Sequence, residues 1–118
     1  MVRVYFKNFV LEDDIIFTKG KNEIEIKVEG HTGLGFKGAD VVCSAISALV
    51  QTSILAINRV AKINQKVKQR DGYLKSSIPI VYINVDEEKS LKIILNTMIV
   101  GLNEIDNNYP GTLEISYI

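Results

Sequence analysis

Two stretches near the N-terminus alternate between apolar and polar residues. Residues 2–7 and 23–29 each place apolar side chains at about every second position. Because successive side chains of a strand point to opposite faces, this pattern predicts two strands with one buried and one solvent-facing side. Between them, residues 8–22 contain the turn signal KGKN at positions 19–22. That signal favours a hairpin or an extended excursion in this segment.

The spacing of apolar residues then changes to three and four. It holds from Val41 to about Lys66, which predicts a helix over that range, and Asp40 is a good N-cap for it. A cluster of basic residues falls in the last part of this segment, where cations complement the helix dipole. The cluster consists of Arg59, Lys62, Lys66, Lys68 and Arg70. We expect it to be a solvated helix end, and contact with an acidic partner is the less favoured interpretation.

The first part of this helix carries no charge. The uncharged run from Val41 to Ile57 is about 17 residues long, which is near the lower limit for a membrane span. Its serines, threonine and glutamine would be costly in hydrocarbon without partners. A helix buried in a small domain explains the run better, so we expect no membrane partner.

The second half of the chain repeats the change from strand to helix. After the Asp71-Gly72 break, residues 73–85 are rich in β-branched and aromatic side chains, which predicts one bent strand or two short ones. An acidic start at residues 86–88 precedes apolar positions at helical spacing up to Ile105, which predicts a second helix.

Residues 113–117 alternate again and are expected to form the last strand. The order of elements predicts an α+β fold: a single small domain over residues 1–118, with a mostly antiparallel sheet and two helices.

Composition excludes several classes of protein. Fourteen Lys and Arg residues balance fourteen Asp and Glu residues, and 47% of the 118 residues are apolar, as in an ordinary globular domain. Nothing in this balance demands nucleic acid as a partner. The single cysteine cannot form an intramolecular disulfide, and the N-terminus shows no signal-peptide pattern. We therefore expect a cytoplasmic protein.

The stretch GHTGLGFKGADVVC, residues 30–43, contains a G-x-G-x-x-G pattern in Gly33, Gly35 and Gly38. A dinucleotide site also needs an acidic residue about twenty positions further on, but no Asp or Glu lies between Asp40 and Asp71. A Walker loop needs Lys and Ser or Thr after its last glycine, and these are absent as well. The pattern therefore does not predict phosphate binding.

The loop also carries two apolar side chains, Leu34 and Phe36. Three glycines alone would indicate a mobile turn, which is the alternative interpretation. Apolar side chains within such a loop favour one that closes over an apolar ligand. We therefore treat Gly33, Leu34, Gly35, Phe36 and Gly38 as a candidate substrate-binding loop.

The loop is flanked by the only histidine and the only cysteine of the chain. If Asp40 is the N-cap, Cys43 occupies the third helical position, where unsatisfied N–H groups favour a thiolate and could hold an oxyanion. His31, at the end of the preceding strand, could fold back to serve as its base. Asp40 could cap the helix or orient His31, although a carboxylate near the sulfur opposes a thiolate.

Cys43 and His31 could also have purely structural roles. A free cysteine is most often a small buried hydrophobe, and His31 could be a polar residue at a strand end. A metal centre is less favoured, since Cys43, His31 and Asp40 fall short of a four-ligand structural site. We expect neither a metal nor a cofactor.

The stretch GHTGLGFKGADVVCSAISAL resembles the motif of the ribosomal-processing cysteine protease family, Prp. In that motif Gly-His opens a glycine-bearing loop, and Asp-x-x-Cys follows with the cysteine twelve positions after the histidine. His31 and Cys43 have this spacing. The similarity returns in GLNEIDNNYP near the C-terminus, while Thr32 and Ser44 stand where alanines are common.

This resemblance implies a homodimeric cytoplasmic endopeptidase that removes a short N-terminal extension from the large-subunit ribosomal protein number twenty-seven. It makes Cys43 the nucleophile and His31 its base, and Asp40 and Ser47 match further positions of the motif. Ser47 lies one helical turn beyond Cys43 and could support the thiol or the substrate. The partners implied are the extension peptide and a second copy of the chain, without direct contact to nucleic acid.

Two other functions compete with this interpretation. A non-catalytic ribosome-assembly or RNA-binding module would use the loop only for contact, and predicts a basic stripe with exposed aromatic residues. A thiol-based redox sensor usually needs a resolving cysteine, which here could come only from another chain.

Overall fold

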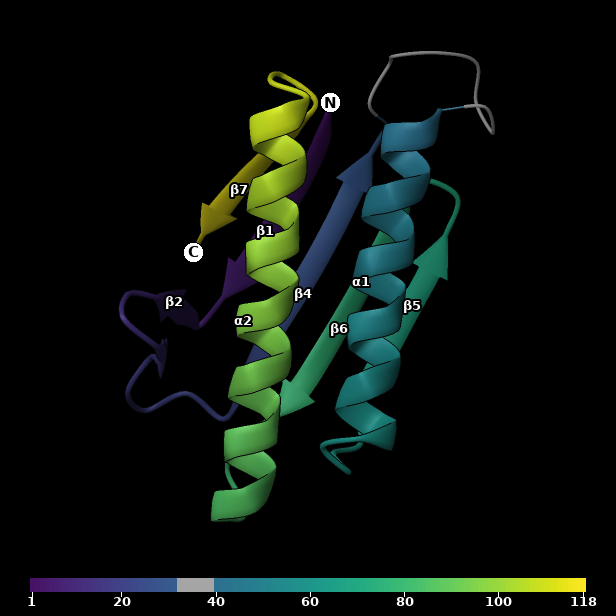
Figure 1. The fold of residues 1–118 in the computed structure, drawn as a ribbon. Coiled ribbons are helices and arrows are strands. Elements are labelled where there is room, and N and C mark those ends of the chain that lie inside the picture. The colour runs from purple at the N-terminus through teal and green to yellow at the C-terminus, as the bar shows by residue number, and fades with distance from the viewer. Residues whose placement is uncertain (32–39) are drawn as a thin grey trace.

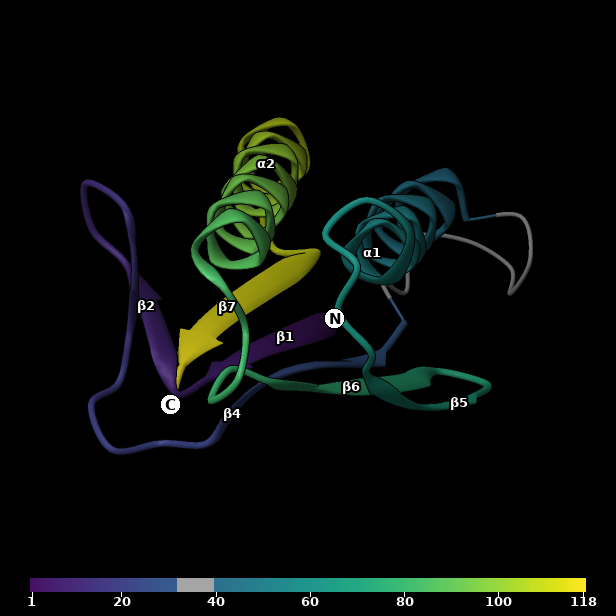
Figure 2. The ribbon, with the colours of Figure 1, turned by 90° about the horizontal axis from the view of Figure 1, so that it is seen from below.

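The computed structural model describes residues 1–31 and 40–118. Its elements follow in the order β1 (Val2–Lys7), β2 (Phe9–Leu11), β3 (Ile15–Phe17), β4 (Glu23–Gly30), α1 (Val41–Arg59), β5 (Lys66–Arg70), β6 (Tyr73–Pro79), α2 (Val85–Asn108) and β7 (Leu113–Tyr117). Within these residues the main sheet has five strands, in the order β5-β6-β4-β1-β7. Both helices lie on the same face of this sheet (Figures 1 and 2).

The pairing within the sheet is antiparallel at every junction except one. Strand β1 pairs antiparallel with β4 and parallel with β7, and β6 pairs antiparallel with both β4 and β5. The predicted α+β fold with a mostly antiparallel sheet and two helices is therefore confirmed.

The hydrophobic core lies between the sheet and the two helices. Phe6 and Ile26 are fully buried on the sheet side, and Ile57 and Leu95 on the helix side. The helices approach closely at Gly101, where an added Cβ would lie 2.7 Å from Leu49 Cδ2. A side chain at this place would therefore have to push α1 and α2 apart or displace Leu49.

Helix α1 is long and apolar enough to cross a membrane by length and composition. In the fold its apolar side chains have another use, because five of them are buried against the sheet and α2. These are Val42, Ile46, Val50, Ile54 and Ile57. The uncharged run is thus explained by a core helix, as the sequence predicted.

The segment between the first two predicted strands forms a separate two-stranded hairpin of β2 and β3. Phe9 and Ile15 are buried, and the hairpin stands beside α2 at the edge of the sheet (Figure 2). Its turn lies at residues 12–14. The KGKN signal at 19–22 instead connects β3 to β4, with Gly20 at a φ of +81°.

The predicted extent of the first helix was wrong at its C-terminal end. Helix α1 ends at Arg59, and Lys62 then adopts a φ of +61°. The apolar spacing continued past the helix because Ala61 and Ile63 are also buried, although they lie in a connection rather than in a helix.

The basic cluster was therefore also misplaced. Lys66, Lys68 and Arg70 belong to the edge strand β5, in which every residue is exposed. A strand without a buried face has no alternation of apolar and polar residues, so no pattern in this segment predicts a strand. This strand matters for the site, because β5 and β6 form a hairpin whose turn reaches the end of β4.

Helix α2 begins as predicted from its acidic start. Asn84 is its N-cap, and the Asn84 and Glu87 side chains form a reciprocal capping box with the two backbone amides. After α2, Leu113–Tyr117 form the predicted last strand, β7. Residues 73–85 contain a single strand, β6, which ends at Pro79.

Strand β6 is also tied to β4 on the open face of the sheet. Lys75 Nζ lies 3.0 Å from Glu25 Oε1, and this hydrogen bond and the Glu25 charge raise the pKa of the Lys75 ammonium. The contact and the β4–β6 ladder fix the position of the β5–β6 hairpin relative to the end of β4.

Candidate active site

Cys43 lies at the start of α1, at the third helical position that the sequence predicted. Asp40 is the N-cap, and its Oδ1 accepts a hydrogen bond of 3.0 Å from the Cys43 backbone amide. Asp40 is buried, with 8% of its surface exposed. The predicted N-cap role of Asp40 is confirmed, and the Cys43 amide that could have held an oxyanion is engaged by this cap.

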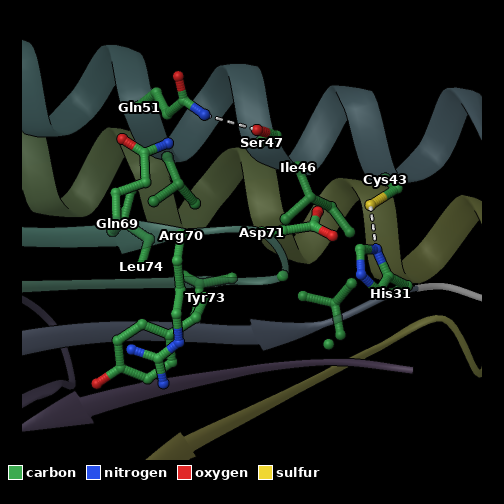
Figure 3. Close-up of a pocket in the computed structure, with 15 residues that line it drawn as sticks. His31, Cys43, Ile46, Ser47, Gln51, Gln69, Arg70, Asp71, Tyr73 and Leu74 are labelled. Atoms are coloured by element: carbon green, nitrogen blue, oxygen red, sulfur yellow. Dashed lines mark hydrogen bonds between the residues drawn. The ribbon is translucent and has the colours of Figure 1, made fainter. Parts of the chain in front are cut away.

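His31 follows directly after β4 and reaches across to the start of α1. Its Nδ1 lies 4.0 Å from Cys43 Sγ (Figure 3), so the structure brings together the two residues that the sequence paired. The His31 ring is exposed, whereas Cys43 is half-buried. At 4.0 Å the contact is at the outer limit for a hydrogen bond to sulfur, and the imidazole is within reach of the thiol proton.

The backbone around His31 is held from two sides. The Met1 amine donates to the His31 carbonyl at 2.6 Å. The Gly30 amide donates to the Gly72 carbonyl in the β5–β6 turn at 2.9 Å. Gly30 itself has a φ of +102°, a conformation that glycine adopts without strain. The end of β4 is thus fixed between β1 and the β5–β6 turn.

A cavity of about 350 Å³ opens next to the thiol and the imidazole, between α1 and the β5–β6 hairpin (Figure 3). Part of its lining is apolar, from Ile46 and Val50 of α1 and Leu74 of β6. These three side chains are buried parts of the core. The cavity is therefore an opening in the side of the core, and an apolar group placed there would be shielded from water.

The polar lining of the cavity comes from both walls. Ser47 lies on α1, and its Oγ accepts a hydrogen bond of 2.8 Å from Gln51 Nε2. Gln69, on β5, lines the same cavity from the other side (Figure 3). The structure places the predicted supporting residue Ser47 in the cavity with Cys43.

The sequence did not predict several residues that line the cavity, among them Gln51, Gln69, Asp71 and Gly72. Gln51 was within reach of a local argument, since it lies one helical turn after Ser47 and two after Cys43. The other three come from the β5–β6 hairpin, and no sequence signal places that hairpin next to the end of β4.

The candidate substrate-binding loop, Gly33, Leu34, Gly35, Phe36 and Gly38, lies outside the described residues. Within residues 1–31 and 40–118, no group of three His, Cys, Asp or Glu side chains is arranged to hold a metal ion.

The family profile described as "Cysteine protease Prp" matches residues 14–114. The ribosomal processing cysteine protease Prp of Staphylococcus aureus strain Mu50 is 29% identical over 93 residues, covering 79% of this chain and 85% of that protein. The crystal structure of S. aureus Prp in complex with a covalently linked product peptide has a TM-score of 0.71 and 26% identity over the full length of both chains.

A second crystal structure, of S. aureus Prp in complex with a substrate peptide, has a TM-score of 0.66 and 21% identity over the full length of both chains. At that identity the likeness shows a shared fold. The profile match spans most of the chain and includes both His31 and Cys43. The chain therefore belongs to the Prp family of cysteine proteases.

Proposed function

We propose that this protease removes the N-terminal extension of the large-subunit ribosomal protein number twenty-seven. The observation that carries the proposal is the approach of His31 Nδ1 to Cys43 Sγ beside a cavity that opens into the core. The S. aureus relatives support it, because one is named a ribosomal processing protease and another is a complex with a covalently linked product peptide.

In the proposed reaction Cys43 is the nucleophile and His31 the general base and acid. The Cys43 thiol gives its proton to the imidazole as Sγ attacks the scissile carbonyl carbon. The C–N bond then breaks, and the imidazolium returns the proton to the departing amine, which leaves a thioester on Cys43. Water attacks this thioester with His31 accepting a proton, and cleavage of the C–S bond releases the acid and restores the thiol.

The cavity supplies positioning for this reaction. Its apolar lining suits a substrate side chain that is removed from water. The hydroxyl of Ser47 and the carboxamides of Gln51 and Gln69 suit the amide groups of a peptide backbone. Asp40 fixes the first helical turn and so the position of the sulfur. Ser47 lies one turn further along α1, on the wall that a bound peptide would face.

The deciding experiment is cleavage of a peptide copied from the ribosomal extension, followed by mass spectrometry of the products. Wild-type enzyme should cut at one bond, and the same peptide with its residues in scrambled order should stay intact. If the scrambled peptide is cut equally well, the substrate assignment is wrong even though the protease assignment stands.

We further propose that the enzyme acts as a cytoplasmic homodimer, as the resemblance to the family implies. Exposed apolar side chains on the outer surface of the helix layer support a second copy as partner: Leu55 and Val60 at the end of α1, and Ile93 and Val100 on α2. Sedimentation velocity of the full chain should give twice the mass of one chain, and cell fractionation should recover it in the cytosol.

A further inference from the structure

The β5–β6 turn lies against the imidazole of His31 on the side away from Cys43. An added Cβ on Gly72 would lie 2.9 Å from His31 Nε2, 3.5 Å from Cε1 and 3.6 Å from Cδ2. The ring therefore packs directly on the α-carbon of Gly72. Since Nδ1 is 4.0 Å from Cys43 Sγ, the imidazole lies between the sulfur and the turn.

We propose that Gly72 is a positioning residue of the protease: the absence of a side chain there leaves the space in which the His31 ring faces Cys43. Two contacts make the relation specific. The Gly72 carbonyl accepts the hydrogen bond from Gly30, the residue before His31. The ladder of β4 with β6 pairs Glu29 with Tyr73, so the turn is held in register with the end of β4.

A methyl group at position 72 would displace the ring rather than the backbone. No Cβ contact as short as 2.9 Å is tolerated, and the atom that must yield is the outer edge of an exposed side chain. Moving that ring costs the fold little, because it is not part of the core. It changes the distance and angle between Nδ1 and Sγ, on which proton transfer depends.

Glycine at position 72 also suits the local backbone conformation. The test must therefore separate this conformational role from the role of leaving space for the His31 ring. Gly72 has a φ of +69°, which strains any other residue. Gly20 has a φ of +81°, and nothing among the described residues lies within 4 Å of a Cβ added there. Gly20→Ala therefore carries the same kind of backbone strain without a contact to His31, and is the matched control.

The first measurement is steady-state cleavage of the extension peptide, and it rests on the proposed function. Gly72→Ala should lower kcat by about 10²-fold, the effect of misplacing a catalytic group by about 1 Å, with KM little changed. Gly20→Ala should keep the wild-type kcat although its melting temperature falls similarly. Gly72→Asn has the same Cβ but tolerates a positive φ better, so it should lose kcat as Gly72→Ala does while keeping more thermal stability.

The second measurement does not depend on the substrate. The rate at which iodoacetamide alkylates Cys43 is followed as a function of pH in the wild type, Gly72→Ala, Gly20→Ala and His31→Ala. The profile of Gly72→Ala should move toward that of His31→Ala, while the profile of Gly20→Ala should match the wild type. This result would stand even if the extension peptide were not the substrate.

The inference fails if Gly72→Ala keeps the wild-type alkylation profile, since the imidazole would then act on the thiol regardless of the turn. It also fails if Gly20→Ala loses as much kcat as Gly72→Ala, or if Gly72→Asn restores full activity. Either result would reduce Gly72 to a residue required by backbone conformation alone.

Discussion

The buried carboxylate of Asp40 accepts a hydrogen bond of 3.0 Å from the backbone amide of Cys43. The same side chain therefore begins α1 and fixes the residue that carries the sulfur. The Asp40 carbonyl also accepts from the Ser44 amide at 3.0 Å, which continues the first turn. Removing the cap should thus affect stability and the position of the thiol together.

Asp40→Ala should lower the free energy of unfolding by about 1 kcal/mol, within the range of about 0.5–2 kcal/mol for lost N-caps. Asp40→Asn should be nearly as stable as the wild type, because the asparagine oxygen can accept the same hydrogen bond. Urea denaturation measures both. Asp40→Asn should also cost less activity than His31→Ala, and a larger loss would give the carboxylate charge a role beyond the cap.

Cys43→Ala and Cys43→Ser should each abolish cleavage of the ribosomal extension while leaving the circular dichroism spectrum and melting curve close to wild type. The reason is that the proposed thioester cannot form without the sulfur. Ser44→Ala is the matched control, because Ser44 is the adjacent exposed residue on the same helical turn, and it should stay active. Full activity in purified Cys43→Ala would overturn the proposed mechanism.

His31→Ala should reduce the rate of cleavage by about 10²–10⁴-fold, which is the usual contribution of a general base. The pH dependence of kcat/KM identifies the group. If His31 is the base, the mutant profile should lose the acidic limb of the wild type. A mutant that kept this limb would show that another group titrates there.

The local parts of this site could be predicted from the sequence, and the non-local parts could not. The position of Cys43 relative to Asp40 follows from four consecutive residues and the rules of helix capping. The pairing with His31 followed from the spacing of a motif. By contrast, Gly72 contacts His31 because β6 pairs with β4, and that pairing is not encoded in the neighbourhood of either residue.

The difference between local and non-local contacts also explains where the fold prediction was wrong. The sequence did not predict strand β5, and its basic residues were assigned to a helix end. All residues of β5 are exposed, so its pattern has no buried face that would indicate a strand. The buried residues Ala61 and Ile63 extended the helical spacing, although the chain had already left the helix at Arg59. Predicting β5 would have required knowing that β6 has an open edge.

Gln51→Ala and Gln69→Ala should raise KM for the extension peptide by about threefold to tenfold each, as expected for loss of one hydrogen bond of about 0.5–1.5 kcal/mol. Both glutamines line the cavity from opposite walls, and their carboxamides can donate to and accept from a peptide backbone. Thr52→Ala is the control, since Thr52 is an exposed neighbour of Gln51 on α1. An unchanged KM in the double variant Gln51→Ala/Gln69→Ala would place the peptide elsewhere.

Gly30→Ala should be the most damaging of the glycine substitutions near the site. An added Cβ would overlap the Met1 carbonyl oxygen, and the φ of +102° adds backbone strain. Unlike the ring that faces Gly72, this obstacle is backbone, so β1 and β4 would have to separate where Val2 pairs with Gly30. We expect a loss of about 1–3 kcal/mol in the free energy of unfolding, with Gly20→Ala again as the control for positive φ alone.

Hydrogen exchange of Gly30→Ala should show faster exchange of the amides at the start of β1 and the end of β4. Unchanged protection of these amides would mean that the chain accommodates the methyl group without separating the two strands.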